Sequence, residues 1–232
     1  MISNEKIKEL SKLNQKKYRD ESGLFLVEGE HLVSEADKHG IVLEKYSIKD
    51  LDGFITIPKE KMKKICQTDT VVNQVALCKK IVKAEKTNHI LILDRIQDPG
   101  NMGTLMRSAV SFGFNTIFLQ DGCVDIYNDK VIRSSQGAIF KLNFLFGDAL
   151  EFIKTLNDYQ VFGTNVVSGI DVSKVETQSR FAVVLGNEGS GVSQDIQDYL
   201  QQNIYIKMLN TESLNVAIAG SIIMYELTKK LI

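Results

Sequence analysis

From residue 89 onward, short apolar runs alternate regularly with helical patterns, and this alternation limits the folds open to the chain. The apolar runs predict strands at 89–94, 116–120, 142–146, 161–164, 181–185 and 204–208. Helical periodicity predicts helices between them at 102–112, 130–140, 149–158, 193–201 and 213–231. Because strands that are apolar throughout are buried on both faces, the pattern predicts an α/β fold with a parallel sheet covered by helices on both sides.

The first 84 residues follow a different pattern, with shorter and more mixed segments. They predict helices at 4–17, 30–39 and 59–66, and strands at 23–29, 54–57 and 71–78. The polar and charged stretch 79–88 indicates a linker. We therefore expect two domains, a small α/β domain at 1–84 and a larger domain at 85–232.

The composition excludes several classes of protein. An apolar content of 44% and a charged content of 25% are ordinary for a soluble globular chain. No apolar run approaches the roughly 18 residues that span a bilayer, and the N-terminus lacks the apolar core of a secretory signal. Three cysteines without paired spacing fit reduced thiols in a cytoplasm. With only three histidines, we expect no metal site.

Charge is unevenly distributed, although the net charge is only −1. Residues 1–84 hold 16 Lys and Arg against 13 Asp and Glu, whereas residues 85–232 hold 12 against 16. Basic residues gather at the start of the chain, at Lys6, Lys8, Lys12, Lys16, Lys17 and Arg19. Such local basic density is what phosphate binding requires. The alternative is a solvated helix face.

Three segments at the ends of predicted strands carry candidate site residues. The first runs from Asp94 to Arg107. Pro99-Gly100 indicates a turn, and Asn101 can cap the helix that follows. Arg107 lies one and a half turns into that helix, where its planar fork can face a phosphate.

The second segment, Gly186 to Gly191, follows the apolar strand at 181–185. Its glycine spacing differs from the dinucleotide fingerprint, and no Gly-Lys-Ser/Thr follows. Three glycines allow backbone groups to contact a ligand directly. The carboxylate of Glu188 would repel a phosphate but suits an adenosine hydroxyl or a sulfonium. A flexible turn is the alternative interpretation.

The third segment, Ile206 to Val216, leads into the C-terminal helix. Ser213 or Asn210 can cap this helix. Asn215 stands inside an apolar run, so its amide needs polar partners, and we expect it to point at a polar site or a neighbouring loop. The helix itself is apolar nearly all round, which predicts burial within the domain or at a subunit interface.

Taken together and in this order, the three segments resemble the SpoU/TrmH family of RNA ribose 2′-O-methyltransferases, which belongs to the SPOUT superfamily. The resemblance covers residues 89–232, and residues 16–29 are similar to the RNA-binding extension that precedes many members. It implies a trefoil knot near the C-terminus, preceded by an L30e-like α/β domain. It also implies a homodimer that uses S-adenosylmethionine, without a metal, to methylate a ribose 2′-hydroxyl.

The resemblance also implies roles for individual residues. The catalytic positions of the family correspond to Asn101, Arg107, Glu188, Ser213 and Asn215. The expected cofactor-binding residues are Thr164, Leu185, Gly186, Gly189, Ile206, Met208 and Leu214. The expected RNA contacts are Lys16, Lys17 and Arg19. Because a guanidinium stays protonated, we prefer for Arg107 a role in gripping a phosphate, with a general-base role as the alternative.

Two residues depart from the family pattern, Lys207 in place of a usual proline and Asn210 in place of a usual glycine. The loop between Met208 and Ser213 also looks one residue shorter than usual. We predict an RNA 2′-O-methyltransferase acting on 23S ribosomal RNA in the cytoplasm. The alternatives are a tRNA 2′-O-methyltransferase, a non-catalytic RNA-binding module of the same fold, and a nucleotide-binding protein that uses the loop at 186–191.

Overall fold

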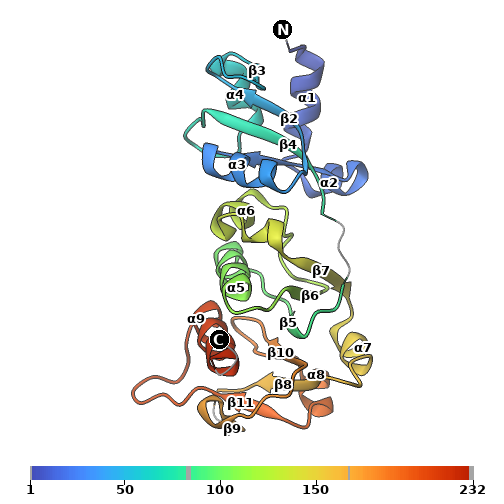
Figure 1. The fold of residues 1–232 in the computed structure, drawn as a ribbon, viewed down its shortest axis with the longest axis vertical. Helices are drawn as coiled ribbons and strands as arrows, with labels where there is room; N and C mark the ends of the chain where they lie inside the picture. The colour runs from blue at the N-terminus through green and yellow to red at the C-terminus, as the bar shows by residue number, and fades with distance from the viewer. Residues whose placement is uncertain (1, 82–84, 167, 230–232) are drawn as a thin grey trace. The chain divides into compact units, whose positions relative to one another are not determined.

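The computed structural model describes residues 2–81, 85–166 and 168–229. Its contacts divide the chain into two compact units (Figure 1). The first comprises the chain up to Ile81 together with Asp125–Phe140, and the second comprises the described parts of Val82–Val124 and Lys141–Ile232. The domain boundary expected at residue 84 stays a prediction, because residues 82–84 lie outside the described residues.

The described part of the first unit contains a four-stranded sheet with the strand order β1-β4-β2-β3. Strand β4 pairs antiparallel with β1 and β2, and β3 pairs parallel with β2. The strands are β1 (Leu24–Glu28), β2 (Val42–Ser47), β3 (Ile55–Thr56) and β4 (Gln74–Lys79). The helices are α1 (Asn4–Lys12), α2 (Lys16–Ser22), α3 (Glu30–Lys38) and α4 (Lys59–Ile65).

Two local features of this unit differ from the sequence prediction. The single helix expected at 4–17 is divided into α1 and α2, and α2 ends at Gly23, whose φ of 69° suits a glycine. Strand β2 was not predicted, because the charged pair Glu44 and Lys45 interrupts its apolar pattern. A register shift between Val42 and Glu44 further disturbs the alternation.

The segment 125–140 packs into the first unit although it comes later in the chain. It contains α6 (Asp129–Ser135) and begins the 3-10 helix η1 (Ala138–Lys141), whereas one helix was predicted at 130–140. The break falls at Gln136 and Gly137, which both have positive φ. The ring of Tyr127 lies 4.6 Å from that of Phe25, and its hydroxyl accepts a hydrogen bond from the amide of Ile81.

A seven-stranded parallel sheet forms the centre of the second unit, within its described residues. The strand order is β7-β6-β5-β10-β8-β11-β9, which confirms the predicted parallel sheet. The strands are β5 (His89–Leu93), β6 (Thr116–Gln120), β7 (Asn143–Gly147), β8 (Gln160–Thr164), β9 (Ile170–Asp171), β10 (Phe181–Leu185) and β11 (Asn203–Tyr205). Short β9 and the 3-10 helix η2 (Val172–Lys174) were not predicted.

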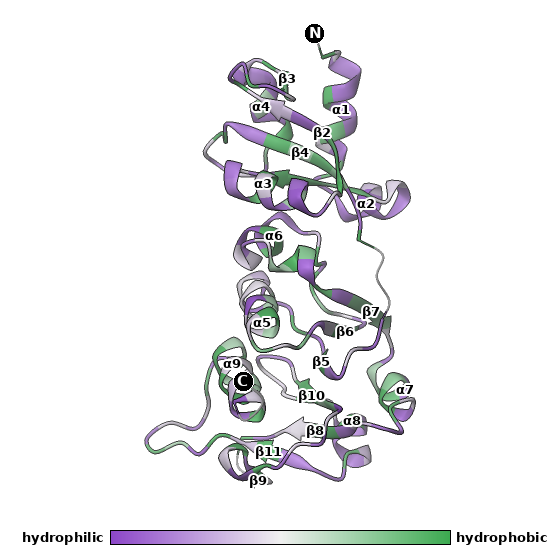
Figure 2. Cartoon of the chain, in the orientation of Figure 1, coloured by the Kyte–Doolittle hydropathy of each residue, from purple (hydrophilic) through white to green (hydrophobic). Residues whose placement is uncertain are grey.

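Helices cover both faces of this sheet. Side chains at alternate positions of β5 and β10, such as Ile90 and Val184, cluster with α7 (Ala149–Lys154) and α8 (Gln194–Tyr199). On the opposite face, Leu185 approaches Gly220 of α9 (Val216–Thr228) and Leu105 of α5 (Pro99–Ser111) lies against the same glycine. Strands such as β10 are accordingly hydrophobic, whereas α1 is largely hydrophilic (Figure 2).

The C-terminal helix α9 is buried on one side only. Its buried residues are Ala217, Gly220, Ile223, Met224, Leu227 and Thr228. On its other side, Ile218, Ile222 and Tyr225 remain 53%, 36% and 48% exposed. Of the helix expected at 213–231, the last two residues lie outside the described part of the chain. Among the described residues, no helix is both long and apolar enough to span a membrane.

Arg19 and Asp125 form a largely buried ion pair in the first unit, from which we predict the effect of a substitution on stability. The side chain of Arg19 is 4% exposed, donates to Asp125 Oδ2 over 2.6 Å and donates to the carbonyl of Leu13 over 2.7 Å. We expect Arg19→Met to lower the free energy of unfolding by about 3 kcal/mol, because it leaves the Asp125 carboxylate, which is only 14% exposed, without its counter-charge. Urea unfolding followed by circular dichroism measures this change.

Two further variants make the test specific. Lys17 lies two positions away on an exposed surface, and Lys17→Met should change stability by no more than about 0.5 kcal/mol. The double variant Arg19→Met with Asp125→Leu should recover much of the loss, because an apolar pair can replace a buried ion pair. Unchanged urea resistance of Arg19→Met would contradict the structural role.

Candidate active site

Loops at the carboxyl ends of β8, β10 and β11 meet at one cavity of about 660 Å3 in the second unit. Parallel sheets commonly bind ligands at this edge, and the volume lies within the range of roughly 300–1,000 Å3 for small-molecule pockets. Its walls come from Thr164, Asn165, Val166, the run 185–192, Gln197, Ile206, Met208, the run 213–216, Ala219 and Ile223.

The structure brings most of the predicted site residues together at this cavity. All seven residues expected to bind the cofactor line it, namely Thr164, Leu185, Gly186, Gly189, Ile206, Met208 and Leu214. Of the five expected catalytic residues, Glu188, Ser213 and Asn215 also line it. Asn101 and Arg107 lie outside the lining, both on helix α5.

The carboxylate of Glu188 holds the second loop against the first. It accepts hydrogen bonds from the amides of Gln97 and Asp98 over 3.4 and 3.2 Å, and from Asn101 Nδ2 over 3.1 Å. Burial alone would raise the pKa of Glu188, but the hydrogen bonds from Asn101 and from backbone amides outweigh it and lower the pKa. Glu188 therefore stands at the cavity as a carboxylate.

Asn101 connects this carboxylate to the third segment. Its Oδ1 accepts a hydrogen bond from Asn215 Nδ2 over 2.9 Å, as expected for an Asn215 that points at a neighbouring loop. The sequence interpretation of Asn101 as a helix cap is wrong. Helix α5 begins at Pro99, and the cap is Asp98, whose Oδ1 accepts from the amide of Asn101. The Asn101 side chain is thereby left to join the two loops.

Asn215 also starts the C-terminal helix. Its Oδ1 accepts from the amides of Ala217 and Ile218 over 2.9 and 3.3 Å, so Asn215 is the cap of α9 in place of the expected Ser213 or Asn210. The same side chain thus caps α9 through its oxygen and reaches Asn101 through its nitrogen. Ser213 is exposed and lines the cavity without capping the helix.

Asn187 was missed by the sequence reasoning, although it shapes the second loop. Its Oδ1 accepts from the amides of Gly189 and Ser190 over 3.0 and 3.1 Å, and its Nδ2 donates to the carbonyl of Arg95 over 2.8 Å. Two backbone hydrogen bonds between Asn187 and Gly191 close the turn. Asparagine within a glycine-rich turn is the signal that could have identified it, since its side chain often bonds to nearby backbone.

The buried carboxylate of Asp94, at the start of the first loop, bonds to the backbone just after the second loop. It is fully buried, pairs with Arg95 over 2.7 Å and accepts from the amide of Ser193 over 2.7 Å. Burial alone would raise the pKa of Asp94, but the hydrogen bonds from Arg95 and Ser193 lower it overall. Arg95 has a positive φ of 57°, a conformation that non-glycine residues rarely adopt.

Gly186 leaves no room for a side chain. A Cβ at this position would overlap the carbonyl carbon of Gly191 and the amide nitrogen of Val192. The chain therefore crosses itself closely at the cavity wall, and glycine is required there for steric reasons. Thr164, at the end of the neighbouring strand β8, donates through its hydroxyl to the carbonyl of Val184 over 2.8 Å.

The remaining predicted residues lie away from the cavity. Arg107 is exposed on α5, and no hydrogen bond or ion pair joins its guanidinium to another described residue. Lys207 and Asn210 are exposed and do not line the cavity, whereas Met208 between them does.

The three residues expected to bind RNA lie in the first unit. Lys16 and Lys17 are exposed, as a phosphate contact requires. Arg19 is buried and paired with Asp125, so its guanidinium is not accessible to a phosphate.

The cavity fits a ligand with an uncharged polar ring system and a positive charge. Leu185, Ile206, Met208 and Leu214 supply apolar walls, and the glycine-rich turn supplies backbone groups. Glu188 supplies negative charge, and none of the described residues that line the cavity is basic. Within the described residues there is also no cluster of His, Cys, Asp and Glu that could hold a metal ion.

Comparison with known proteins agrees with this geometry. Residues 88–225 match the SpoU rRNA Methylase family, and residues 4–91 match the MRM3-like substrate binding domain. A 23S rRNA (guanosine(2553)-2′-O)-methyltransferase of Bacillus subtilis, RlmP, is 32% identical, and the match covers 97% of this chain and 96% of that protein.

Solved structures show the same fold. An AdoMet-bound rRNA methyltransferase from Sinorhizobium meliloti superposes with a TM-score of 0.88 at 23% identity, covering 100% of this chain and 97% of that one. A putative TrmH-family RNA methyltransferase from Porphyromonas gingivalis superposes with a TM-score of 0.87 at 27% identity, covering 99% of both chains. The resemblance inferred from the three segments is confirmed, and the chain belongs to the SpoU rRNA methylase family.

Proposed function

We propose that this protein transfers a methyl group from S-adenosylmethionine to a ribose 2′-hydroxyl of ribosomal RNA, with 23S rRNA as the substrate. One observation carries the proposal: in a chain of the SpoU family, all seven residues expected to hold the cofactor line a single cavity. The Bacillus relative, matched over 96% of its length, is named for this reaction on 23S rRNA. A cytoplasmic location follows from this substrate.

The cavity is suited to this cofactor in both shape and charge. Apolar side chains and backbone groups fit an adenosine, and the Glu188 carboxylate favours a cation. S-adenosylmethionine would supply a methyl group on a positively charged sulfur; the ribose oxygen would take the methyl carbon, the sulfur would keep the electrons of the broken bond, and the hydroxyl proton would be lost. The chain's own residues must bind the cofactor and the ribose, orient them, and assist the loss of that proton.

Glu188, Asn101 and Asn215 orient the loops around the reacting atoms. Their hydrogen bonds of 2.9 to 3.1 Å tie the first loop, the second loop and the start of α9 to one another. A preorganised site of this kind does not have to rearrange as the reaction proceeds, which lowers the barrier. We assign these three residues the role of holding the cavity wall that faces α5.

Arg107 is the residue that we assign to the RNA. Its guanidinium is exposed and bonds to no other described residue, so it is free to grip a phosphate next to the target ribose. A protonated guanidinium also stabilises negative charge that develops on the hydroxyl oxygen. The resemblance to the SpoU/TrmH family implies that this arginine acts close to the cofactor of a partner subunit. We therefore propose a homodimer. The trefoil knot and the L30e-like assignment stay predictions.

Binding of the cofactor is the first test. We expect calorimetry to show binding of S-adenosylmethionine in the presence of a chelator, and Gly186→Ala to abolish it, because the added Cβ would overlap backbone atoms of Gly191 and Val192. Gly189→Ala is the comparison within the same loop. Its Cβ would lie 3.6 Å from Asn187 Oδ1, an ordinary contact, so it should weaken binding less. Equal binding by wild type and Gly186→Ala would remove this cavity as the cofactor site.

Substitution of Arg107 tests its assignment to the RNA. Arg107→Ala should slow single-turnover methylation about a hundredfold or more, because a charge-assisted contact that strengthens in the transition state is lost. Cofactor affinity should stay unchanged, since Arg107 does not line the cavity. Arg107→Lys should recover little of the rate, because an ammonium lacks the planar fork.

Lys154→Ala, at an exposed lysine of helix α7 in the same unit, is the control for loss of a basic residue. It should leave both rate and affinity at the wild-type level. If Arg107→Ala methylates normally, Arg107 does not act on the RNA. If it loses cofactor binding as well, the arginine supports the cavity.

A substitution on the exposed face of α9 tests the proposed homodimer. Ile218, Ile222 and Tyr225 form an apolar surface at helical spacing. We expect sedimentation to give a dimer at micromolar concentration, and Ile222→Glu to give a monomer because it buries a charge in the contact. Leu43→Glu, at an apolar side chain that is 52% exposed in the first unit, should remain dimeric. A wild-type monomer would contradict the proposal.

A further inference from the structure

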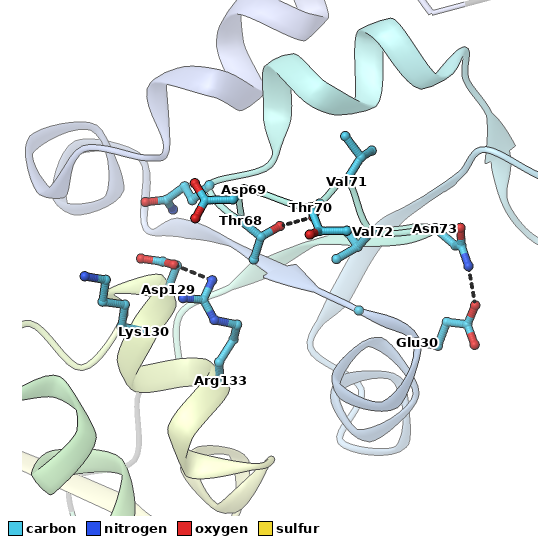
Figure 3. Close-up of a pocket in the computed structure, with 12 residues that line it drawn as sticks. Glu30, Thr68, Asp69, Thr70, Val71, Val72, Asn73, Asp129, Lys130 and Arg133 are labelled. Atoms are coloured by element: carbon cyan, nitrogen blue, oxygen red, sulfur yellow. Dashed lines mark hydrogen bonds and ion pairs between the residues drawn. The ribbon is translucent and has the colours of Figure 1, made fainter.

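The first unit contains a second cavity, of about 1,010 Å3, that the proposed methyl transfer does not use. Three segments far apart in the chain form it: the turn between β1 and α3, the loop between α4 and β4, and helix α6 (Figure 3). Its lining consists of Gly29, Glu30, the run 67–73, Asp129, Lys130 and Arg133. Nearly all of these residues carry hydrogen-bonding side chains.

A buried carboxylate fixes the loop that forms one wall. Glu28, which is 6% exposed, accepts from the amide of Gln67 over 2.8 Å, and its Oε2 lies 3.0 Å from the hydroxyl of Thr68. The Thr68 hydroxyl also lies 2.8 Å from the carbonyl of Thr70. Because these contacts hold the loop in place, the wall is formed before any ligand binds.

Of the five charged side chains that line the pocket, two form an ion pair and a third accepts a hydrogen bond from an amide. Glu30 accepts from Asn73 Nδ2 over 3.1 Å, and Asp129 pairs with Arg133 over 2.6 Å, as the dashed lines in Figure 3 show. Asp69 and Lys130 are exposed, and neither side chain has a hydrogen bond or ion pair with another described residue. The pocket thus offers one free carboxylate and one free ammonium group.

This charge distribution selects among ligands. Three carboxylates against two basic groups leave the lining slightly negative, which disfavours a polyphosphate. A nucleobase is neutral, and its amino group donates to a carboxylate such as that of Asp69. Lys130 suits a single phosphate as a point charge, and the side chains of Val71 and Val72 offer apolar contact to a flat ring.

We propose that this pocket binds an unpaired nucleotide of the RNA, with the amino edge of its base at Asp69 and its phosphate at Lys130. Recognition of RNA sequence commonly relies on such unstacked bases, read along their hydrogen-bonding edges. The inference rests on the proposed function, because it assumes an RNA substrate. It agrees with the match of residues 4–91 to a substrate binding domain and adds α6, which lies outside that match, to the binding surface.

Binding of short RNA by the full chain tests the proposal. The probes are a nine-residue oligouridylate and three versions in which the central uridine is replaced by guanosine, cytidine or adenosine. We expect the probes with an amino group on the central base to bind about tenfold more tightly than oligouridylate, in line with the roughly 1–3 kcal/mol of a good base contact. Asp69→Ala removes the acceptor and should abolish this difference, whereas Asp52→Ala, at an exposed aspartate outside the pocket, should keep it.

Lys130→Ala should weaken binding of all four probes alike and lower the salt dependence of binding by about 0.7, the slope expected for one phosphate of a single strand. Lys38→Ala, at a surface lysine paired with Glu35, is the matched control and should leave the slope unchanged. Equal binding of all probes by wild type, or base preference retained by Asp69→Ala, would overturn the assignment. Guanosine monophosphate that competes as well as the oligonucleotide would show a site for free nucleotides instead.

Cofactor titration separates this proposal from the proposed function. Asp69→Ala and Lys130→Ala should bind S-adenosylmethionine as wild type does, because both residues lie in the first unit. A wild-type chain that reads the central base but fails to bind S-adenosylmethionine would contradict the methyltransferase proposal alone. A chain that binds the cofactor but does not distinguish the probes would contradict the pocket assignment alone.

Discussion

The candidate site depends on two hydrogen bonds, one that Asn101 donates to Glu188 and one that Asn215 donates to Asn101. They connect the first loop, over 3.1 and 2.9 Å, to two segments that lie 87 and 114 residues further along the chain. Each amide has one acceptor and one donor group, so a chain of two amides can join a carboxylate to a helix cap without an unpaired group. Because Glu188 and Asn215 are exposed, loss of any member would leave its neighbours to bond with water, and the loops would lose a contact that joins them.

Burial and hydrogen bonding have opposite effects on the pKa values of two carboxylates at the site, Glu188 and Asp94. Burial would raise the pKa of Glu188 and of Asp94, yet hydrogen bonds from amides and from Arg95 lower both values. Because these folded-state pKa values lie below the unfolded ones, both carboxylates stabilise the fold above the ordinary carboxyl pKa. That contribution is lost as the pH falls through the lowered values. The same donors that hold the loops therefore also keep Glu188 negative at neutral pH.

The sequence predicted the second sheet well because its strands are apolar throughout, as in Phe181–Leu185, and this pattern has few alternative structures. The resemblance to the SpoU/TrmH family, which rests on three segments at strand ends, also led to residues that line the cavity. The sequence prediction failed where tertiary contacts override local pattern. Asp98 rather than Asn101 caps α5, and β2 forms despite its charged residues because β4 pairs with it along its length.

The segment 125–140 shows why domain boundaries are hard to read from a linear pattern. It lies within the match to the SpoU family, yet its Asp125 neutralises Arg19 and its Tyr127 packs on Phe25 in the first unit. A chain cut near residue 84 would lack the Asp125 carboxylate that pairs with Arg19 and the Tyr127 ring that packs on Phe25. The first unit therefore includes residues that the sequence places among the strands and helices of the second.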